Sequence, residues 1–234
     1  MVIGNGLLAK AFMKYKNSED IVIFASGVSN SSELNKEAFK REIELLENIL
    51  LSHHNELLVY FSSCDVIYAD EIGKPYYYHK LEMEEIIKKR CKKYFIFRLP
   101  QLIGKSSNKN SLINYFINSI LEDKKIVVWK NAYKNLIDVK DVKNMVEFLI
   151  QNEESNKTIN LINKHYYSVL EIIRILESSV SKKAHIELID KGFKPEYVRL
   201  NILDDLNINF DNNYLQKSIE FNYSEEIIKK AKIV

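Results

Sequence analysis

The fold of this chain is decided by its first twelve residues, "MVIGNGLLAKAF" (1–12). Three apolar residues lead into a turn with two glycines, and a run with the apolar spacing of a helix follows. The chain of 234 residues holds only six glycines, so the pair Gly4 and Gly6 indicates a backbone requirement. A strand, a glycine turn with Ala9 in the third glycine place, and a helix bring backbone amides close to a pyrophosphate. We therefore predict a dinucleotide-binding turn at 4–9; the competing interpretation is an ordinary tight turn between strand and helix.

Runs typical of strands alternate with runs typical of helices along the rest of the chain. The expected strands lie at 1–3, 20–26, 56–64, 94–100, 124–129, 157–162 and 184–190. The expected helices lie at 34–54, 75–93, 111–123, 138–154, 168–180 and 224–234. Pro75 suits the first turn of one helix, and Ser168 suits the cap of another. This alternation predicts an α/β fold, a Rossmann-like, doubly wound and mostly parallel sheet.

The second half of the chain is less regular, with short strand-like pieces between helices. This change predicts a small additional lobe. We expect a dinucleotide-binding core over residues 1–163, with lobe insertions at about 101–136. Residues 164–234 are expected to form a small substrate-binding lobe.

The composition argues against several classes of protein. The net charge of +2 offers no electrostatic case for nucleic acid, and no apolar run is long enough to predict a membrane span. Cys64 and Cys91 are too few for a disulfide framework or a zinc site, so we expect no metal. The first residues lack the basic start and cleavage site of a signal peptide. Together these features predict a cytoplasmic protein with no nucleic-acid or membrane partner.

Three consecutive tyrosines stand in "PYYYHKLEMEEII" (75–87), before a charged helical run. A catalytic tyrosine needs a nearby cation, because its pKa near 10 must fall toward working pH. A residue four positions along a helix lies on the same face. Of the three, only Tyr76 has a cation there, Lys80; Tyr77 and Tyr78 do not. Because this spacing is weak evidence by itself, its meaning depends on the surrounding motifs.

Those motifs are ordered in a specific way. The glycine turn comes first, a strand ending in "YFSSC" (60–64) second, Tyr76 and Lys80 third, and "FRLPQLIG" (97–104) fourth. "NLIDVKDV" (135–142), with Asp138 and Asp141 as its acids, follows. In this order the chain resembles the extended short-chain dehydrogenase/reductase superfamily, in its NAD-dependent epimerase/dehydratase branch, over nearly its whole length.

The resemblance implies a set of roles. Tyr76 is expected to be the general acid/base, with Lys80 lowering its pKa and holding the nicotinamide ribose. Ser63, at the strand end, is expected to polarise the sugar carbonyl. The expected cofactor is NAD or NADP. The residues expected to bind it are Gly4, Asn5, Gly6, Leu7, Leu8, Ala25, Ser26, Gly27, Ser62, Lys80, Leu99 and Pro100.

The substrate that the resemblance implies is a nucleotide-activated sugar. The implied chemistry is hydride exchange between NAD(P) and a sugar carbon, from which reduction, epimerisation through a keto intermediate, and dehydration all start. Family habits suggest surface polysaccharide biosynthesis as the setting. They also suggest a homodimer through the helices at about 36–53 and 76–91.

The chain departs from the family pattern in three places. Only a few residues separate the first helix from the strand at 20–26. That strand is either the family's fourth, with the second and third absent, or the second; under both readings the acid that holds the adenosine ribose is missing. The loop at 65–74 is shorter than usual. The strand-end position is Ser63 or Cys64, and we favour Ser63 because a thiol is a weak hydrogen-bond donor.

A second function also fits these departures. A dehydrogenase-like fold that has lost its cofactor would serve a binding or regulatory role. Measuring cofactor binding separates this hypothesis from the enzyme. His79 has no partnering pattern, so we expect it at the surface or at an interface.

Overall fold

The computed structural model describes residues 1–106 and 108–231, and the chain divides into two compact units. Unit 1 is formed by Met1–Leu99, Val142–Leu161 and Val198–Leu206. Unit 2 is formed by Pro100–Asp141, Ile162–Tyr197 and the residues from Asn207 onward. Residues 198–206 thus belong to the first unit, although they lie within the span predicted for the lobe.

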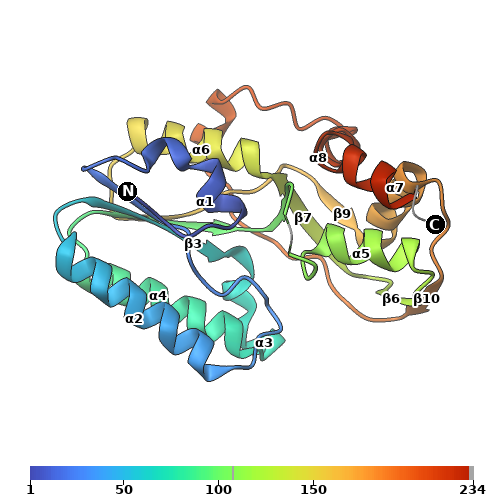
Figure 1. Cartoon of the computed structure of the whole chain (residues 1–234), viewed down its shortest axis with the longest axis horizontal. Coiled ribbons are helices and arrows are strands. Elements are labelled where there is room, and N and C mark those ends of the chain that lie inside the picture. Colours follow the sequence, from blue (N-terminus) through green and yellow to red (C-terminus); the bar gives the residue numbers. More distant parts are fainter. Residues whose placement is uncertain (107, 232–234) are drawn as a thin grey trace. The chain divides into compact units, whose positions relative to one another are not determined.

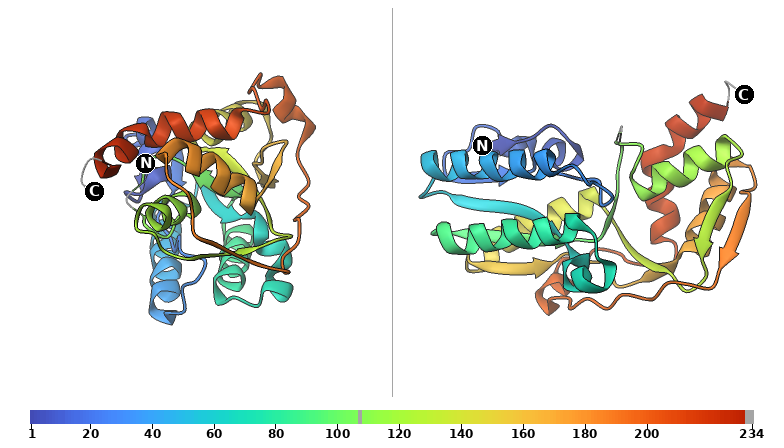
Figure 2. Two further views of the ribbon diagram at one scale, coloured as in Figure 1. Left: turned by 90° about the vertical axis from the view of Figure 1, so that its right-hand side faces the viewer. Right: turned by 90° about the horizontal axis from the view of Figure 1, so that it is seen from below.

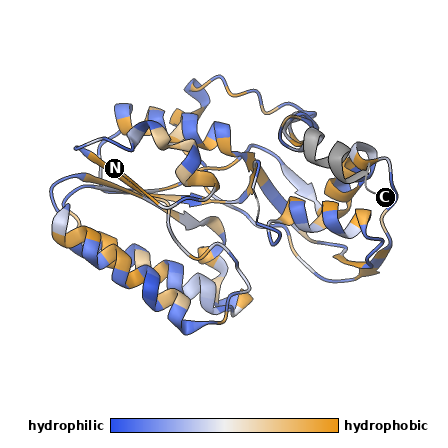
Figure 3. Ribbon diagram, viewed as in Figure 1, coloured by the Kyte–Doolittle hydropathy of each residue, from blue (hydrophilic) through white to orange (hydrophobic). Residues whose placement is uncertain are grey.

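Unit 1 is built on a five-stranded sheet with the order β1-β2-β3-β4-β8. The strands are β1 (Val2–Ile3), β2 (Ile21–Phe24), β3 (Leu57–Ser63), β4 (Tyr94–Leu99) and β8 (Lys157–Asn160). Every neighbouring pair is parallel. β3 and β4 are near-continuous apolar runs with buried interiors, as expected of parallel strands covered on both faces. Figure 3 shows these strands as largely hydrophobic.

Helices cover both faces of this sheet, as Figure 1 shows. On one face lie α2 (Lys36–Ser52) and α4 (Pro75–Arg90), which run side by side in the view from below in Figure 2. On the other face lie α1 (Leu7–Ala11) and α6 (Val139–Asn152). The prediction of a doubly wound, mostly parallel α/β fold is therefore confirmed.

The position of β1 decides between the two readings of the strand at 20–26. β1 is at the edge of the sheet, and β2 lies between β1 and β3. In a doubly wound sheet of order 3-2-1-4-5-6, the neighbour of strand 1 on the way to strand 5 is strand 4. Between β1 and β2 the described chain holds only α1 and a 3-10 helix, Met13–Tyr15. The second and third strands of the usual order are thus absent, and β2 takes the fourth place.

Local sequence signals set the helix starts in this unit. The side chain of Asn35 accepts a hydrogen bond from the Glu37 amide and caps α2. α4 begins at Pro75, as predicted, because proline suits the first turn. The segment expected as a trimmed loop is instead a 3-10 helix, Cys64–Tyr68, and the short helix α3, Ala69–Ile72. These turns carry the chain directly from the end of β3 to α4.

Unit 2 combines small sheets with three helices. β5 (Gln101–Ile103), β7 (Tyr133–Asp138) and β9 (Tyr166–Ser168) form one sheet, and β6 (Ile126–Trp129) pairs in parallel with β10 (Ile186–Ile189). The helices are α5 (Leu112–Leu121), α7 (Val169–Val180) and α8 (Tyr214–Ala231). Their apolar faces share one core, which includes Ile117, Leu176 and Leu215.

Two features of unit 2 bear on the expectations from sequence. The Ser168 hydroxyl accepts a hydrogen bond from the Glu171 amide, so the predicted cap of α7 is confirmed. α8 begins at Tyr214, ten residues before the expected helix, and further along it the Tyr223 hydroxyl donates to the Gly104 carbonyl. None of the helices in the described part of the chain is long and apolar enough to cross a membrane.

Candidate active site

The glycine turn joins β1 to α1 and is exposed. Gly4 has a φ of +117°, and a Cβ there would meet the Ala25 carbonyl oxygen at 2.5 Å. Glycine is therefore required at this position, because only glycine adopts this φ easily and because β2 passes so close. Gly6 has no such restraint: a Cβ there would have no atom within 4 Å. The backbone of Gly6 is thus open to an approaching ligand.

The loop after β2 carries three of the expected cofactor residues, Ala25, Ser26 and Gly27. The Ala25 amide donates to the Ile3 carbonyl, which fixes the loop against the glycine turn. A Cβ on Gly27 would meet the Glu42 Oε1 atom at 2.5 Å. No acidic residue lies between Ala25 and Asn30.

Tyr76 and Lys80 lie together on α4, as their spacing predicts. The Lys80 Nζ atom is 5.7 Å from the centroid of the Tyr76 ring. Tyr76 is in the first turn of the helix and is half-buried, whereas Lys80 is only 3% exposed. The Lys80 ammonium donates to Glu42 Oε1 at 2.9 Å and to the Tyr60 hydroxyl at 3.0 Å.

The electrostatics at Tyr76 differ from the expectation. Burial raises the pKa of Tyr76 above its usual value, and the charges of Glu42 and Asp65 raise it further. Burial alone lowers the pKa of Lys80, but Tyr60 and Glu42 outweigh it and raise that pKa. The predicted lowering of the Tyr76 pKa by Lys80 is therefore not found here, because a carboxylate already neutralises the ammonium.

That carboxylate, Glu42, is a residue of the site that our sequence reasoning missed. It is 4% exposed. Burial raises its pKa, yet the charge of Lys80 and hydrogen bonds from His79, Lys80 and the Val28 amide bring the pKa down to about 2. One signal in the sequence could have found it: Glu42 lies four residues before Leu46 and eight before Leu50, so an acid stands on the apolar stripe of α2. These three are the buried residues of that helix.

Ser63 and Cys64, the two candidates for the strand-end position, differ in burial and in their hydrogen bonds. Ser63 is half-buried, and its hydroxyl oxygen accepts a hydrogen bond from the Asp65 amide at 3.2 Å. Cys64 is buried, and its thiol donates to the Arg98 carbonyl at 3.2 Å. Burial raises the pKa of the Cys64 thiol well above its usual value. Ser63 therefore has the more accessible polar group of the two.

Ser62 has a different setting from the one expected of a cofactor residue. It is buried, and its hydroxyl donates to Glu84 Oε1 at 2.7 Å. Glu84 in turn accepts two hydrogen bonds from Arg98, at 2.9 and 2.7 Å. The Ser62 side chain thus belongs to a buried polar network that joins α4 to the sheet. Leu99 is buried at the end of β4, and Pro100 is half-buried.

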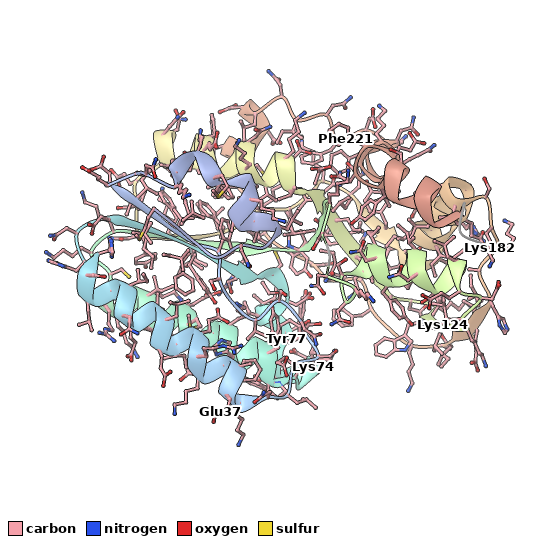
Figure 4. All side chains as sticks on the ribbon, in the orientation of Figure 1. Glu37, Lys74, Tyr77, Lys124, Lys182 and Phe221 are labelled. Carbon is pink, nitrogen blue, oxygen red and sulfur yellow. The ribbon has the colours of Figure 1, made fainter. Side chains whose placement is uncertain are left out.

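Tyr77, Tyr78 and His79, which follow Tyr76 on α4, differ in their burial and in their hydrogen-bond partners. Tyr77 is buried against Val66 and Ala69, and its hydroxyl lies 3.4 Å from Asp65 Oδ2; Figure 4 labels it near the start of the helix. Tyr78 is 45% exposed and donates to Asp70. The expectation for His79 is wrong: it is 4% exposed, and its Nε2 atom lies 2.9 Å from Glu42 Oε2.

The acids of "NLIDVKDV", Asp138 and Asp141, lie in unit 2. The Tyr214 hydroxyl donates to Asp141 at 2.7 Å and accepts from the Asp138 amide at 2.8 Å. Burial raises the pKa of both carboxyls. These contacts hold the start of α8 to Asp138 of β7 and to Asp141, all within unit 2. No group of three or more His, Cys, Asp or Glu side chains that could hold a metal occurs among the described residues.

A parallel sheet of this order, with a glycine turn after its first strand and a Tyr-x-x-x-Lys pair on α4, defines the class of Rossmann-like α/β proteins. A family model described as "NAD dependent epimerase/dehydratase family" matches residues 4–162. The chain therefore belongs to the NAD-dependent epimerase/dehydratase family, as the order of its motifs predicted.

Solved structures of similar fold agree with this assignment. UDP-glucuronic acid 4-epimerase from Bacillus cereus, in complex with UDP-glucuronic acid and NAD, has a TM-score of 0.70 at 15% identity, over 94% of this chain and 78% of that chain. UDP-glucose 4-epimerase from Thermus thermophilus, in complex with NAD, has 0.69 at 13% identity, over 97% and 82%. RMD from Pseudomonas aeruginosa, complexed with NADPH, has 0.68 at 16% identity, over 88% and 82%. At these identities the likeness concerns the fold.

Proposed function

We propose that this protein is an NAD(P)-dependent reductase or epimerase acting on a nucleotide-activated sugar. The observation that carries the proposal is the position of Tyr76 over Lys80, on the helix that follows the strand ending in Ser63. The family assignment and the cofactors bound to the similar structures support it.

The residues around the glycine turn fit a dinucleotide. The exposed Gly6 backbone has no atom where its Cβ would lie, which leaves room for a pyrophosphate against the amides of Leu7 and Leu8. Ala25, Ser26 and Gly27 would lie beneath the cofactor. Lys80 has three N–H donors, of which Glu42 and Tyr60 accept two, so one is left for a ribose hydroxyl.

The proposed chemistry uses three side chains. When bound, the nicotinamide would exchange a hydride with a sugar carbon. Tyr76 would give a proton to the sugar oxygen during reduction, or take it during oxidation. Ser63 would donate a hydrogen bond to that oxygen and so stabilise its developing charge. Lys80 would hold a positive charge near the Tyr76 ring throughout.

Cofactor binding is the experiment that tests this proposal. The purified protein is titrated with NADH and with NADPH while the nicotinamide fluorescence is followed. Nucleotide carried through purification is identified by mass spectrometry. We expect binding of at least one cofactor at micromolar concentration. A protein that binds neither at millimolar concentration contradicts the redox function.

One observation favours the second function, a related fold that binds or regulates without redox chemistry. Lys80 is already paired with Glu42, and the pKa of Tyr76 is raised above its usual value. The absence of the second strand, which normally carries the ribose-holding acid, points the same way. Failure to bind either cofactor in the titration above would support this alternative. The homodimer through α2 and α4, the polysaccharide setting and the cytoplasmic location stay predictions.

A further inference from the structure

One buried carboxylate connects the loop after β2 to α4. Glu42 Oε2 accepts from the Val28 amide at 2.8 Å and lies 2.9 Å from His79 Nε2. Glu42 Oε1 accepts from Lys80 Nζ at 2.9 Å and from the Tyr60 hydroxyl at 3.0 Å. Each carboxylate oxygen thus has two donors, from the loop, from β3 and from α4.

The residues around Glu42 leave space for its carboxylate. Gly27 passes so close to Glu42 that any Cβ would overlap the carboxylate. Glu42 occupies a position on the apolar stripe of α2, where a leucine would be the ordinary residue. A buried charge is costly unless it is paired and hydrogen-bonded, so a helix retains one at such a place only where it is fully satisfied.

Tyr76 lies close enough to the Glu42 carboxylate to feel its negative charge. The groups that face it are Glu42 from α2, Asp65 from the 3-10 helix after β3, and Lys80 from its own helix. The Tyr77 ring packs edge-on against it, with centroids 5.1 Å apart. The two carboxylates disfavour the phenolate, and Lys80 is the nearby cation that Glu42 neutralises.

We propose that Glu42 is a positioning residue of this site: its carboxylate fixes both the cofactor loop, through Val28, and the Lys80 ammonium beneath Tyr76. This inference rests on the proposed function, because it gives Glu42 a part in holding the cofactor. The residue that connects the proposed cofactor loop to the proposed acid/base therefore lies on α2. Removing the charge should therefore loosen the loop and also release Lys80 to act on Tyr76.

The test compares Glu42→Gln with Glu44→Gln, the same substitution at an exposed position of α2. The first readout is the affinity for NADH or NADPH, for which we expect a loss of about tenfold, since small displacements in a site are costly. The second readout is the titration of Tyr76, followed by NMR at Cζ of isotope-labelled tyrosine and assigned with Tyr76→Phe. We expect its midpoint to fall by about one pH unit, because a like charge is removed and a cation is freed.

The control should match the unmodified protein in both readouts. If either cofactor affinity or the Tyr76 titration is unchanged in Glu42→Gln, the proposal is overturned. If the unmodified protein binds neither cofactor, the proposed function has failed, and the Tyr76 titration then decides the inference alone because it needs no ligand.

A variant that does not fold is recognised by circular dichroism, and Glu42→Asp then takes its place. This variant keeps the buried charge but withdraws it by one methylene from Val28 and Lys80. We expect cofactor affinity to fall by about tenfold while the Tyr76 midpoint stays near its original value. Full cofactor affinity in Glu42→Asp would overturn the proposal.

Discussion

Three adjacent tyrosines have three different environments, although they share one helix turn. Tyr76 lies over the Lys80 ammonium, Tyr77 is buried beside Asp65, and Tyr78 is exposed and bonded to Asp70. The difference follows from the helix period, which turns each residue about 100° from the last. The three side chains therefore point in different directions and meet different partners.

The first prediction concerns Tyr76. Tyr76→Phe should reduce hydride transfer by about 10²-fold or more, because the acid/base hydroxyl is lost, while cofactor affinity stays the same. Tyr78→Phe is the matched control, since it removes only an exposed hydroxyl. Both are measured as the absorbance change of the nicotinamide with a panel of nucleotide-activated hexoses. Full activity in Tyr76→Phe would show that another residue carries the proton.

At the scale of elements, the two glycines of the first turn have different tasks. Gly4 permits β1 to pass close to β2, while Gly6 leaves the exposed side of the turn open. The first is a packing requirement inside the protein, and we propose that the second is a requirement of the dinucleotide. The short helix α1 that follows contains five residues, and Phe12 at its C-terminal end packs against Phe61 of β3.

The second prediction separates these tasks. Gly4→Ala should lower the free energy of unfolding by about 2 kcal/mol or more, because its φ is unfavourable for alanine and its Cβ meets Ala25. Gly6→Ala should change that free energy by less than about 1 kcal/mol and should weaken cofactor binding. Urea unfolding and the fluorescence titration measure the two effects. Equal losses of stability would contradict the distinction.

The third prediction concerns the network that anchors α4 to β4. Arg98→Met leaves the buried Glu84 carboxylate without its main partner, so the free energy of unfolding should fall by about 3–5 kcal/mol. Arg90→Met breaks an ion pair with Glu47 whose side chains are both well exposed, and it should cost at most about 1 kcal/mol. Urea unfolding of the two variants checks the contrast; similar losses would refute the structural role of the network.

For the molecule as a whole, the sheet order matters more than the number of strands. With β1 at the edge and β2 in the fourth place, the strand ends that carry Gly4, Ala25 and Ser63 remain neighbours. Losing the two outer strands removes the usual ribose-holding acid but leaves these ends in register. The shortened sheet therefore keeps the strand ends that carry the proposed site residues and lacks the strand that normally supports the adenosine ribose.

The fourth prediction concerns the stability of the whole chain in acid. Because the pKa of Glu42 is lowered from 4.5 to about 2, its contribution is present above pH 4.5 and is lost as the pH falls toward 2. The loss is on the order of 3 kcal/mol for this group. Urea unfolding between pH 6 and the acid limit should therefore show a steeper decline in the unmodified protein than in Glu42→Gln. Parallel declines would mean that Glu42 is not the group responsible.

Much of the fold could be predicted because its signals are local. The Ser168 cap, the Pro75 start and the buried strands depend on neighbouring residues, and these were predicted correctly. The strands β5, β7 and β9 were missed. β5 and β9 have three residues each, too few for a periodic signal, and all three strands are fixed by pairing with one another. The spacing of Tyr76 and Lys80 was readable for the same local reason.

The sequence by itself determined the alternation of strands and helices in the first unit, the glycine turn and the pair on α4, since each depends on residues within about two helix turns. Only the tertiary structure decided the place of β2 in the sheet and the partner of Lys80. Glu42 and Lys80 are 38 residues apart and lie on different helices. Their meeting depends on how α2 and α4 pack on β3, and that packing is set by the whole sheet rather than by any local pattern.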